Sequence, residues 1–304
     1  MSTRQTGVAL ALVTATISGF AVFLNGYAVK RFDDATVYTT AKNGVAGMLL
    51  VLLALPLLRA GRTATEPAPR PRSGAQRAAL LGVAVVGGSV PFVLFFEGLA
   101  RASSTQAAFI HKTLVIWVAL LAVPLLKERL SWAHYAAIGL LLAGQVALAG
   151  EAGTVALGTG ELMIFAATLL WAVEVVFVKH LLRSLAAPTL AAARLGIGTL
   201  LLLAFVALSG RWSELAALGS AQWAWALLTG VVLAGYVATW YAALARAQAV
   251  DVTAVLVLGA VVTALLDRGI EGAPFDVVGV GLIAVGGAIA ALRVLYPARR
   301  PVTA

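Results

Sequence analysis

The sequence contains no cysteine, few charged residues and only three histidines. The lack of cysteine excludes disulfides, thiolate metal sites and cysteine nucleophiles. Only 12% of the 304 residues are charged, whereas a soluble chain is about one-quarter charged. The few histidines and acidic residues do not form a cluster at metal-ligand spacing. We therefore expect no metal and no cofactor.

Apolar residues make up 61% of the chain, and the mean hydropathy is +0.96. Most of the apolar segments approach the ~20 residues that a helix needs to cross the hydrocarbon core. They do not alternate as barrel strands do, so helices must satisfy the backbone in lipid. We predict an all-α polytopic membrane protein with ten transmembrane helices, at residues 7–28, 36–58, 79–100, 104–125, 131–149, 158–179, 187–208, 220–245, 250–267 and 275–295.

The second half of the chain repeats the first. Leu99-Ala100-Arg101-Ala102 recurs as Leu244-Ala245-Arg246-Ala247, and Ala41-Lys42-x-Gly44 recurs as Ala193-Arg194-x-Gly196. Thr6-Gly7 likewise matches Thr159-Gly160. Five helices per copy is an odd number, so the copies must have opposite orientation. This pattern predicts two inverted five-helix repeats, an architecture typical of secondary transporters, with bounds at 7–149 and 158–292.

The basic residues predict the orientation. The formal net charge of +9 is read as loop charges that set topology rather than as a nucleic-acid surface. Most loop lysines and arginines fall on the side of the N-terminus, whereas the opposite side holds only Lys30, Arg31, Arg101, Arg211 and Arg268. Positive loops face the cytoplasm, so we expect both termini there, in the cytoplasmic membrane of a bacterium.

A resemblance to a known family appears around the turn at residues 126–131. The run from Leu114 to Leu121 leads into Leu126-Lys127-Glu128-Arg129-Leu130-Ser131, and a glycine-punctuated segment, 139–144, follows. This stretch resembles the EamA-type ten-helix transporters of the drug/metabolite transporter superfamily, and the whole chain is similar to the YddG-like aromatic amino-acid exporters. Lys127 stands where the family commonly has glycine. The second copy lacks the Glu-Arg pair and has Asp267-Arg268 and Glu271 nearby.

The resemblance implies a secondary transporter rather than an enzyme. In such transporters the third, fourth, eighth and ninth helices line a central cavity, and the first and sixth complete it. Ionisable side chains within spans are costly and tend to face such a cavity. The strongest candidate is Lys112, which shares a stripe with Thr105 and Ala108. The ionisable and polar candidates for the cavity are Lys112, His111, Thr105, Glu97, Lys42 and Glu174.

Several of these residues also have structural interpretations. His111 can be a packing residue rather than a proton carrier, and Lys42 can snorkel to the membrane surface. Glu97 can pair with Lys112 or with Lys42. Among the deeper aromatic residues we expect cavity positions for Trp117, Trp171, Tyr236, Trp240, Phe92 and Phe96. Pro91 follows Gly87-Gly88, which predicts a kink that serves either as a gate hinge at Pro91 and Gly88 or as a static bend.

The pattern of charges suggests the substrate. Buried cations outnumber buried carboxylates, which favours a substrate with an anionic group, and aromatic walls favour an amphipathic one. An amino acid fits both, so we expect export of amino acids by alternating access. A drug or organic-cation (polyamine) exporter is the alternative, and an intramembrane enzyme that uses His111 is a remote one. Coupling ion, direction and oligomeric state stay open. A homodimer through the fifth and tenth helices is one use of their glycine ridges, Gly139, Gly144, Gly281, Gly286 and Gly287.

Overall fold

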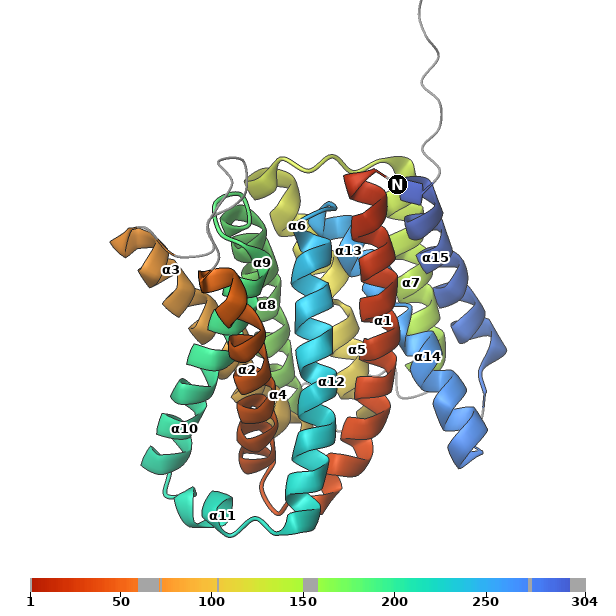
Figure 1. Cartoon of the computed structure of the whole chain (residues 1–304). Coiled ribbons are helices and arrows are strands. Elements are labelled where there is room, and N and C mark those ends of the chain that lie inside the picture. The colour runs from red at the N-terminus through yellow and green to blue at the C-terminus, as the bar shows by residue number, and fades with distance from the viewer. Residues whose placement is uncertain are drawn as a thin grey trace, which may run out of the picture.

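The computed structural model describes residues 2–59, 71, 73–102, 104–149, 158–272 and 275–295. Within these ranges every regular element is a helix and none is a strand (Figure 1). Nine of the helical segments described are long and apolar enough to cross a membrane, and a tenth apolar helix, Trp132–Ala147, is shorter. The prediction of an all-helical membrane protein with ten helices is thus confirmed.

The first half contains five helical segments, two of which are divided. Its third segment changes to π-helix in the middle, and its fourth is broken. The elements are α1 (Thr3–Ala28), η1 (Val29–Arg31), α2 (Ala35–Arg59), α3 (Gly74–Val83), η2 (Ala84–Ser89), α4 (Val90–Leu99), α5 (Ser104–Lys112), α6 (Leu114–Leu126) and α7 (Trp132–Ala149).

The second half also contains five helical segments, but its π-helical turns lie elsewhere. One is in the second segment, and another ends the fourth segment, which is again broken. The elements are α8 (Thr159–Leu181), α9 (Ala187–Ala192), η4 (Ala193–Ile197), α10 (Gly198–Leu208), α11 (Trp212–Ala216), α12 (Ser220–Leu244), α13 (Ala249–Leu256), α14 (Gly259–Leu266), η5 (Asp267–Glu271) and α15 (Val277–Leu295).

The fourth helix of each half is not continuous, although the sequence predicts an unbroken helix in both places. Between α5 and α6, the Thr113 hydroxyl donates to Ile110 O at 2.6 Å and accepts from Trp117 Nε1 at 3.0 Å. Such side-chain bonds compete with the helical ladder. Between α13 and α14, the Leu258 N–H bonds three residues back, to Val255 O at 3.0 Å, and Gly259 follows. Broken helices of this kind are common at transporter binding sites.

The first helix of each half packs against the other half in the same way. A β-carbon placed on Gly7 of α1 would lie 2.8 Å from Ala247 N, and one placed on Gly160 of α8 would lie 3.0 Å from Ala102 N. Gly7 and Gly160 are equivalent in the two copies, as are Ala247 and Ala102. Both contacts allow only glycine, so the repeated sequence marks repeated close packing between the halves.

Both described ends of the chain lie at the same end of the bundle (Figure 1). Gln5 Nε2 donates to Leu295 O at 2.6 Å, which joins the start of α1 to the end of α15. We call this end the terminal end and the opposite one the far end. The last helix, α15, packs along α7.

The α7–α15 contact uses part of the predicted glycine ridge. A β-carbon on Gly144 would lie 2.6 Å from Ile283 Cγ1, and one on Gly286 would lie 2.9 Å from Ala137 O. Gly287 is similarly close to Leu258, at 2.3 Å. Positions Gly139 and Gly281 have no neighbour within 4 Å among the described atoms. Three of the five ridge glycines therefore serve packing within one chain.

Candidate functional site

A cavity of about 640 Å³ lies between the two halves. It is lined by the first, third and fourth helices of both, with one cation contributed by each second helix. Its lining runs from buried residues such as Glu174 and Trp240 to the exposed Lys30 and Glu271 at the far end. The charged and histidine side chains in the lining are Lys30, Lys42, His111, Lys112, Glu174, Arg194, Asp267 and Glu271.

The cation of the second half, Arg194 in η4, is paired with a carboxylate. Arg194 Nη1 lies 3.6 Å from Glu174 Oε2 on α8, and both side chains are buried. The hydroxyl of Tyr241 on α12 donates to Glu174 Oε1. We call Glu174, Arg194 and Tyr241 the triad. Its charges are compensated inside the protein, as buried charges must be.

The backbone carbonyl of Gly87, in the third helix, accepts a hydrogen bond from Arg194 of the triad. Pro91 has no N–H, so the carbonyl of Gly87 loses its helical partner four residues later. Two side chains replace it, because Arg194 Nε and Trp171 Nε1 each donate to Gly87 O at 3.2 Å. A β-carbon on Gly88 would lie 1.7 Å from Arg194 O. This tight packing favours the static bend over the hinge predicted at Pro91 and Gly88, which stays a prediction.

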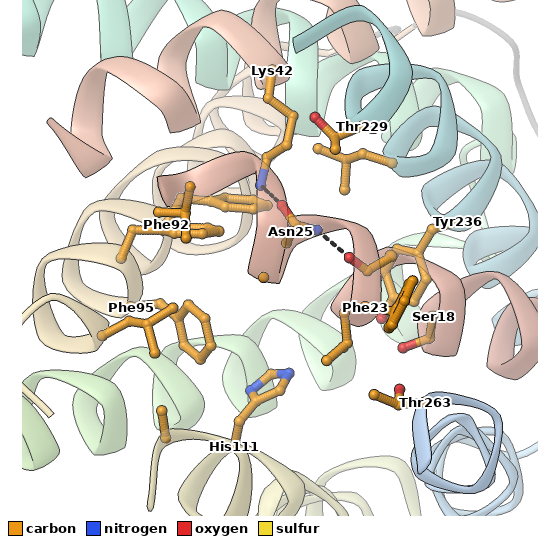
Figure 2. A pocket seen from close by; sticks show the side chains of 18 of the residues that line it. Ser18, Phe23, Asn25, Lys42, Phe92, Phe95, His111, Thr229, Tyr236 and Thr263 are labelled. Atoms are coloured by element: carbon orange, nitrogen blue, oxygen red, sulfur yellow. Dashed lines mark hydrogen bonds between the residues drawn. The ribbon is translucent and has the colours of Figure 1, made fainter. Parts of the chain in front are cut away.

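Lys42 on α2 is the counterpart of Arg194 and has a different environment. Its Nζ donates to Asn25 Oδ1 at 3.1 Å (Figure 2). It forms no ion pair with any residue that the structure describes. Three aromatic rings surround the ammonium, with centroids at 4.8 Å (Tyr38), 5.9 Å (Phe92) and 4.2 Å (Phe96). The side chain is 3% exposed yet belongs to the cavity lining.

An aromatic surface leads from Lys42 to His111 on α5. Phe92 and Phe95 contact Trp171, with ring centroids 5.4 Å and 5.5 Å apart. The His111 ring lies 5.0 Å from that of Trp171 and 5.3 Å from that of Phe95. Its Nδ1 atom is buried and has no hydrogen-bond partner among the described residues. Lys112 lies next to it in the lining, also without a described partner.

The structure brings most of the sequence-predicted residues together. Lining residues among them are Lys112, His111, Lys42, Trp171, Glu174, Tyr236, Trp240, Phe92 and Phe96. Glu97 lies outside the lining and bonds Thr36, Arg101 and Arg211 instead of Lys112 or Lys42. Trp117 also lies outside it, against Phe165. Thr105 falls in α5, but its side chain lies outside the described residues.

A second polar cluster, absent from the sequence-based predictions, occupies the terminal end. Asp251 at the start of α13 accepts from Arg4 Nη2 at 2.7 Å and lies 2.9 Å from His134 Nε2. Arg293 Nη1 lies 2.6 Å from the His134 ring. The signal was present in the sequence, since Asp251 and His134 are ionisable residues at the edges of apolar segments.

Two further contacts close the terminal end. Glu128, in the turn after α6, accepts from the backbone N–H groups of Ala249 at 2.7 Å and Val250 at 3.1 Å. These are free N–H groups at the start of α13, so Glu128 caps that helix from the other half. Burial raises the pKa of the Glu128 carboxyl, against the lowering effect of these two bonds. Lys179 donates to Leu244 O and Ala247 O, each at 2.5 Å.

Comparison with known proteins gives one family. The model of the EamA-like transporter family matches residues 5–149 and, a second time, residues 158–295. Among solved structures, one described only as "Crystal structure of protein" has a TM-score of 0.71 at 18% identity, covering 94% of this chain and 97% of that chain. At this identity it shows a shared fold alone. No curated protein matches the sequence.

Proposed function

The chain thus belongs to the EamA-like transporter family, and we propose that it exports small metabolites across the cytoplasmic membrane of a bacterium by alternating access. Amino acids, aromatic or otherwise amphipathic, are the leading substrate class, as in the YddG-like exporters that the sequence resembles. The supporting observation is the cavity between the two matched halves. It combines an aromatic surface with two lysines, Lys42 and Lys112, that have no carboxylate partner among the described residues.

The positive loops put the terminal end in the cytoplasm. In that orientation the polar cluster around Asp251 closes the cytoplasmic side, and the cavity opens outward at the far end. The observed state is then the outward-open one. Export requires a second state, in which the contacts of Glu128 and Asp251 between the halves separate.

The organic-cation alternative has one supporting feature. Asp267 and Glu271 line the far-end mouth and would attract cations. Deeper in the cavity, however, the carboxylate of Glu174 is already occupied by Arg194 and Tyr241. The enzyme alternative would use His111 as an acid or base. The ring of His111 packs against the rings of Phe95 and Trp171. No group of three potential metal ligands occurs in the described part of the chain. We therefore rank transport of anionic or zwitterionic metabolites first.

The test is uptake into proteoliposomes that contain the purified full chain, measured for a panel of amino acids, amines and cationic dyes. Each substrate is tested with and without a pH gradient, which separates proton coupling from facilitated diffusion. Saturable flux of amino acids supports the proposal. Flux of amines and dyes without amino acids supports the alternative. No flux for any substrate contradicts both.

The oligomeric state is a separate proposal. Gly139 and Gly281 on the α7–α15 pair are the ridge glycines with no described neighbour within 4 Å, and a second copy could pack there. Replacing both by Leu should convert a dimer to a monomer in lipid nanodiscs if this contact exists. An unchanged molecular mass would contradict it.

A further inference from the structure

The two repeats each place a cation at the cavity, but among the described residues only one of these cations has a carboxylate partner. Arg194 has Glu174 at 3.6 Å, whereas Lys42 has a single described hydrogen-bond acceptor, Asn25 Oδ1. That oxygen also accepts from the hydroxyl of Tyr38 at 2.5 Å. An ammonium carries three N–H donors, so two donors of Lys42 remain without a described acceptor.

The rings around Lys42 stabilise the ammonium without neutralising it. Tyr38, Phe92 and Phe96 attract a cation through their π-faces, an interaction worth a fraction of what a buried carboxylate provides. A charge held in this way in a water-excluding site gains more from an incoming anion than an exposed lysine would. The site is therefore built to present a positive charge rather than to pair it.

The deep part of the cavity holds no described acceptor carboxylate for a substrate ammonium. Of the described lining residues, Glu174 is the only carboxylate away from the mouth, since Asp267 and Glu271 lie in η5 near the far end. Glu174 already binds Arg194 and Tyr241. On the opposite side of the aromatic surface, Lys112 adds a second positive charge beside His111. An ammonium there would be repelled from two sides.

From these contacts we infer that Lys42 is the carboxylate subsite of the cavity, and that the site selects amphipathic organic anions without requiring an α-ammonium group. The carboxylate accepts from the two Lys42 donors that have no described acceptor. The apolar body lies on Phe92, Phe95 and Trp171, which continue from the ammonium toward His111. The triad has a structural role, as the fixed contact between α8, η4 and α12. This inference rests on the proposed transport function and specifies which charge the substrate must carry.

Three ligands with the same ring test the charge requirement: 3-phenylpropionate (anion), phenylalanine (zwitterion) and phenethylamine (cation). Binding to the purified full chain is measured by isothermal titration calorimetry, which avoids the leak of weak acids across vesicles. We expect 3-phenylpropionate to bind at least as tightly as phenylalanine, and phenethylamine to bind at least about tenfold more weakly than either. Tighter binding of phenethylamine, or binding of phenylalanine without 3-phenylpropionate, overturns the inference.

Variants then test the residue. Lys42→Met keeps the length of the side chain and removes its charge, and should weaken 3-phenylpropionate binding about tenfold or more, while Lys42→Arg should retain part of it. The matched control is Lys127→Met, which removes a lysine from an exposed turn outside the lining. A melting curve in detergent shows that each variant is folded, and Lys42→Gln replaces Lys42→Met if the latter is not. Unchanged affinity in a folded, uncharged Lys42 variant overturns the subsite.

The two proposals fail separately. If proteoliposomes transport phenylalanine but Lys42 variants bind all three ligands as the wild type does, transport stands and the subsite falls. If the ligands bind as expected but no member of the panel crosses the vesicle membrane, the subsite stands and the transport function falls.

Discussion

The turn after α6 and the turn after α14 occupy equivalent places in the two copies, at opposite ends of the bundle, and they differ in what their acidic residues do. Glu128 in the first turn is 8% exposed and caps α13 of the other half. In the second, Glu271 is exposed at the cavity mouth. The terminal end, where Glu128 caps α13, is closed. The cavity opens at the far end, where the turn lacks the Glu-Arg pair.

The polar contacts between the halves differ in the same direction. At the terminal end, Asp251 and His134 are 1% and 2% exposed. At the far end, Arg211 of the second half reaches Asp34 at 3.3 Å and Glu97 at 3.0 Å, and all three side chains are partly exposed. Exposed pairs contribute little, whereas breaking a buried pair is costly. The two copies thus differ in the turn after their fourth helix, and they also differ in the contacts between the halves, which are buried at the terminal end and partly exposed at the far end.

Removing the carboxylate of Asp251 at the terminal end should have the largest effect on stability. Asp251→Ala removes the buried carboxylate that contacts both His134 and Arg4, and should lower the free energy of unfolding by about 3 kcal/mol. The measurement is denaturation of the purified protein in detergent. The control is Asp33→Asn, which changes an exposed carboxylate. Equal losses from both variants would show that burial at Asp251 does not matter.

The chain also offers a test of whether Asp251→Ala opens this end. Because the natural sequence has no cysteine, a single Thr253→Cys reporter on α13, where Thr253 is 2% exposed, can be labelled without background. A membrane-impermeant thiol reagent should react faster when Asp251 is replaced. An unchanged rate would mean that the cluster stabilises the fold without controlling access.

The next largest effect should come from Glu128, and it tests the comparison of the two turns directly. Glu128→Ala removes the acceptor for two backbone N–H groups and should cost about 2 kcal/mol. Glu271→Ala, which changes the exposed carboxylate in the corresponding turn of the second half, should change stability by less than about 0.5 kcal/mol. Thermal melting of the two variants side by side measures the difference. Equal shifts would remove the distinction between the turns.

The pH dependence of Glu128 has a definite sign. Burial raises its pKa in the folded protein, so the folded state binds the proton more tightly than the unfolded state does. The stability that this provides is present below the unfolded pKa and is lost as the pH rises through the folded one. Glu128→Gln cannot titrate. The melting temperature of the wild type relative to this variant should therefore increase between about pH 7 and about pH 4, and a decrease would contradict the sign.

Much of the fold follows from the sequence, because apolar length and the recurrence of short motifs depend only on local residues. The repeated Gly7 and Gly160 contacts show that the motif matches reflect real packing. The breaks at Thr113 and at Leu258 were not predicted. They arise from side-chain bonds and i→i+3 contacts, which the hydropathy of a segment does not reveal.

The sequence predicted most of the residues that line the site, but not which of its cations pairs with a carboxylate. Periodicity placed Lys112 and Lys42 in spans, yet it cannot tell which cation has a carboxylate partner. The partner of Arg194 comes from α8 and the rings around Lys42 come from α2 and α4, so the difference depends on how helices cross. Glu97 illustrates the same limit, since its partner Arg211 is more than a hundred residues away.

The smallest predicted effect concerns the backbone of the first turn. Lys127 has a φ of 57°, in the left-handed region, and is the only non-glycine residue with positive φ in the described chain. At the equivalent end of η5 the residue is Gly272, with a φ of 68°. Left-handed backbone ending a helix favours glycine. Lys127→Gly should therefore raise stability by about 0.5–1 kcal/mol, and Gly272→Lys should lower it by a similar amount. Thermal melting measures both. A loss of stability in Lys127→Gly would show that the lysine side chain contributes more to this turn than its backbone strain costs, and so that the two turns differ in one more respect.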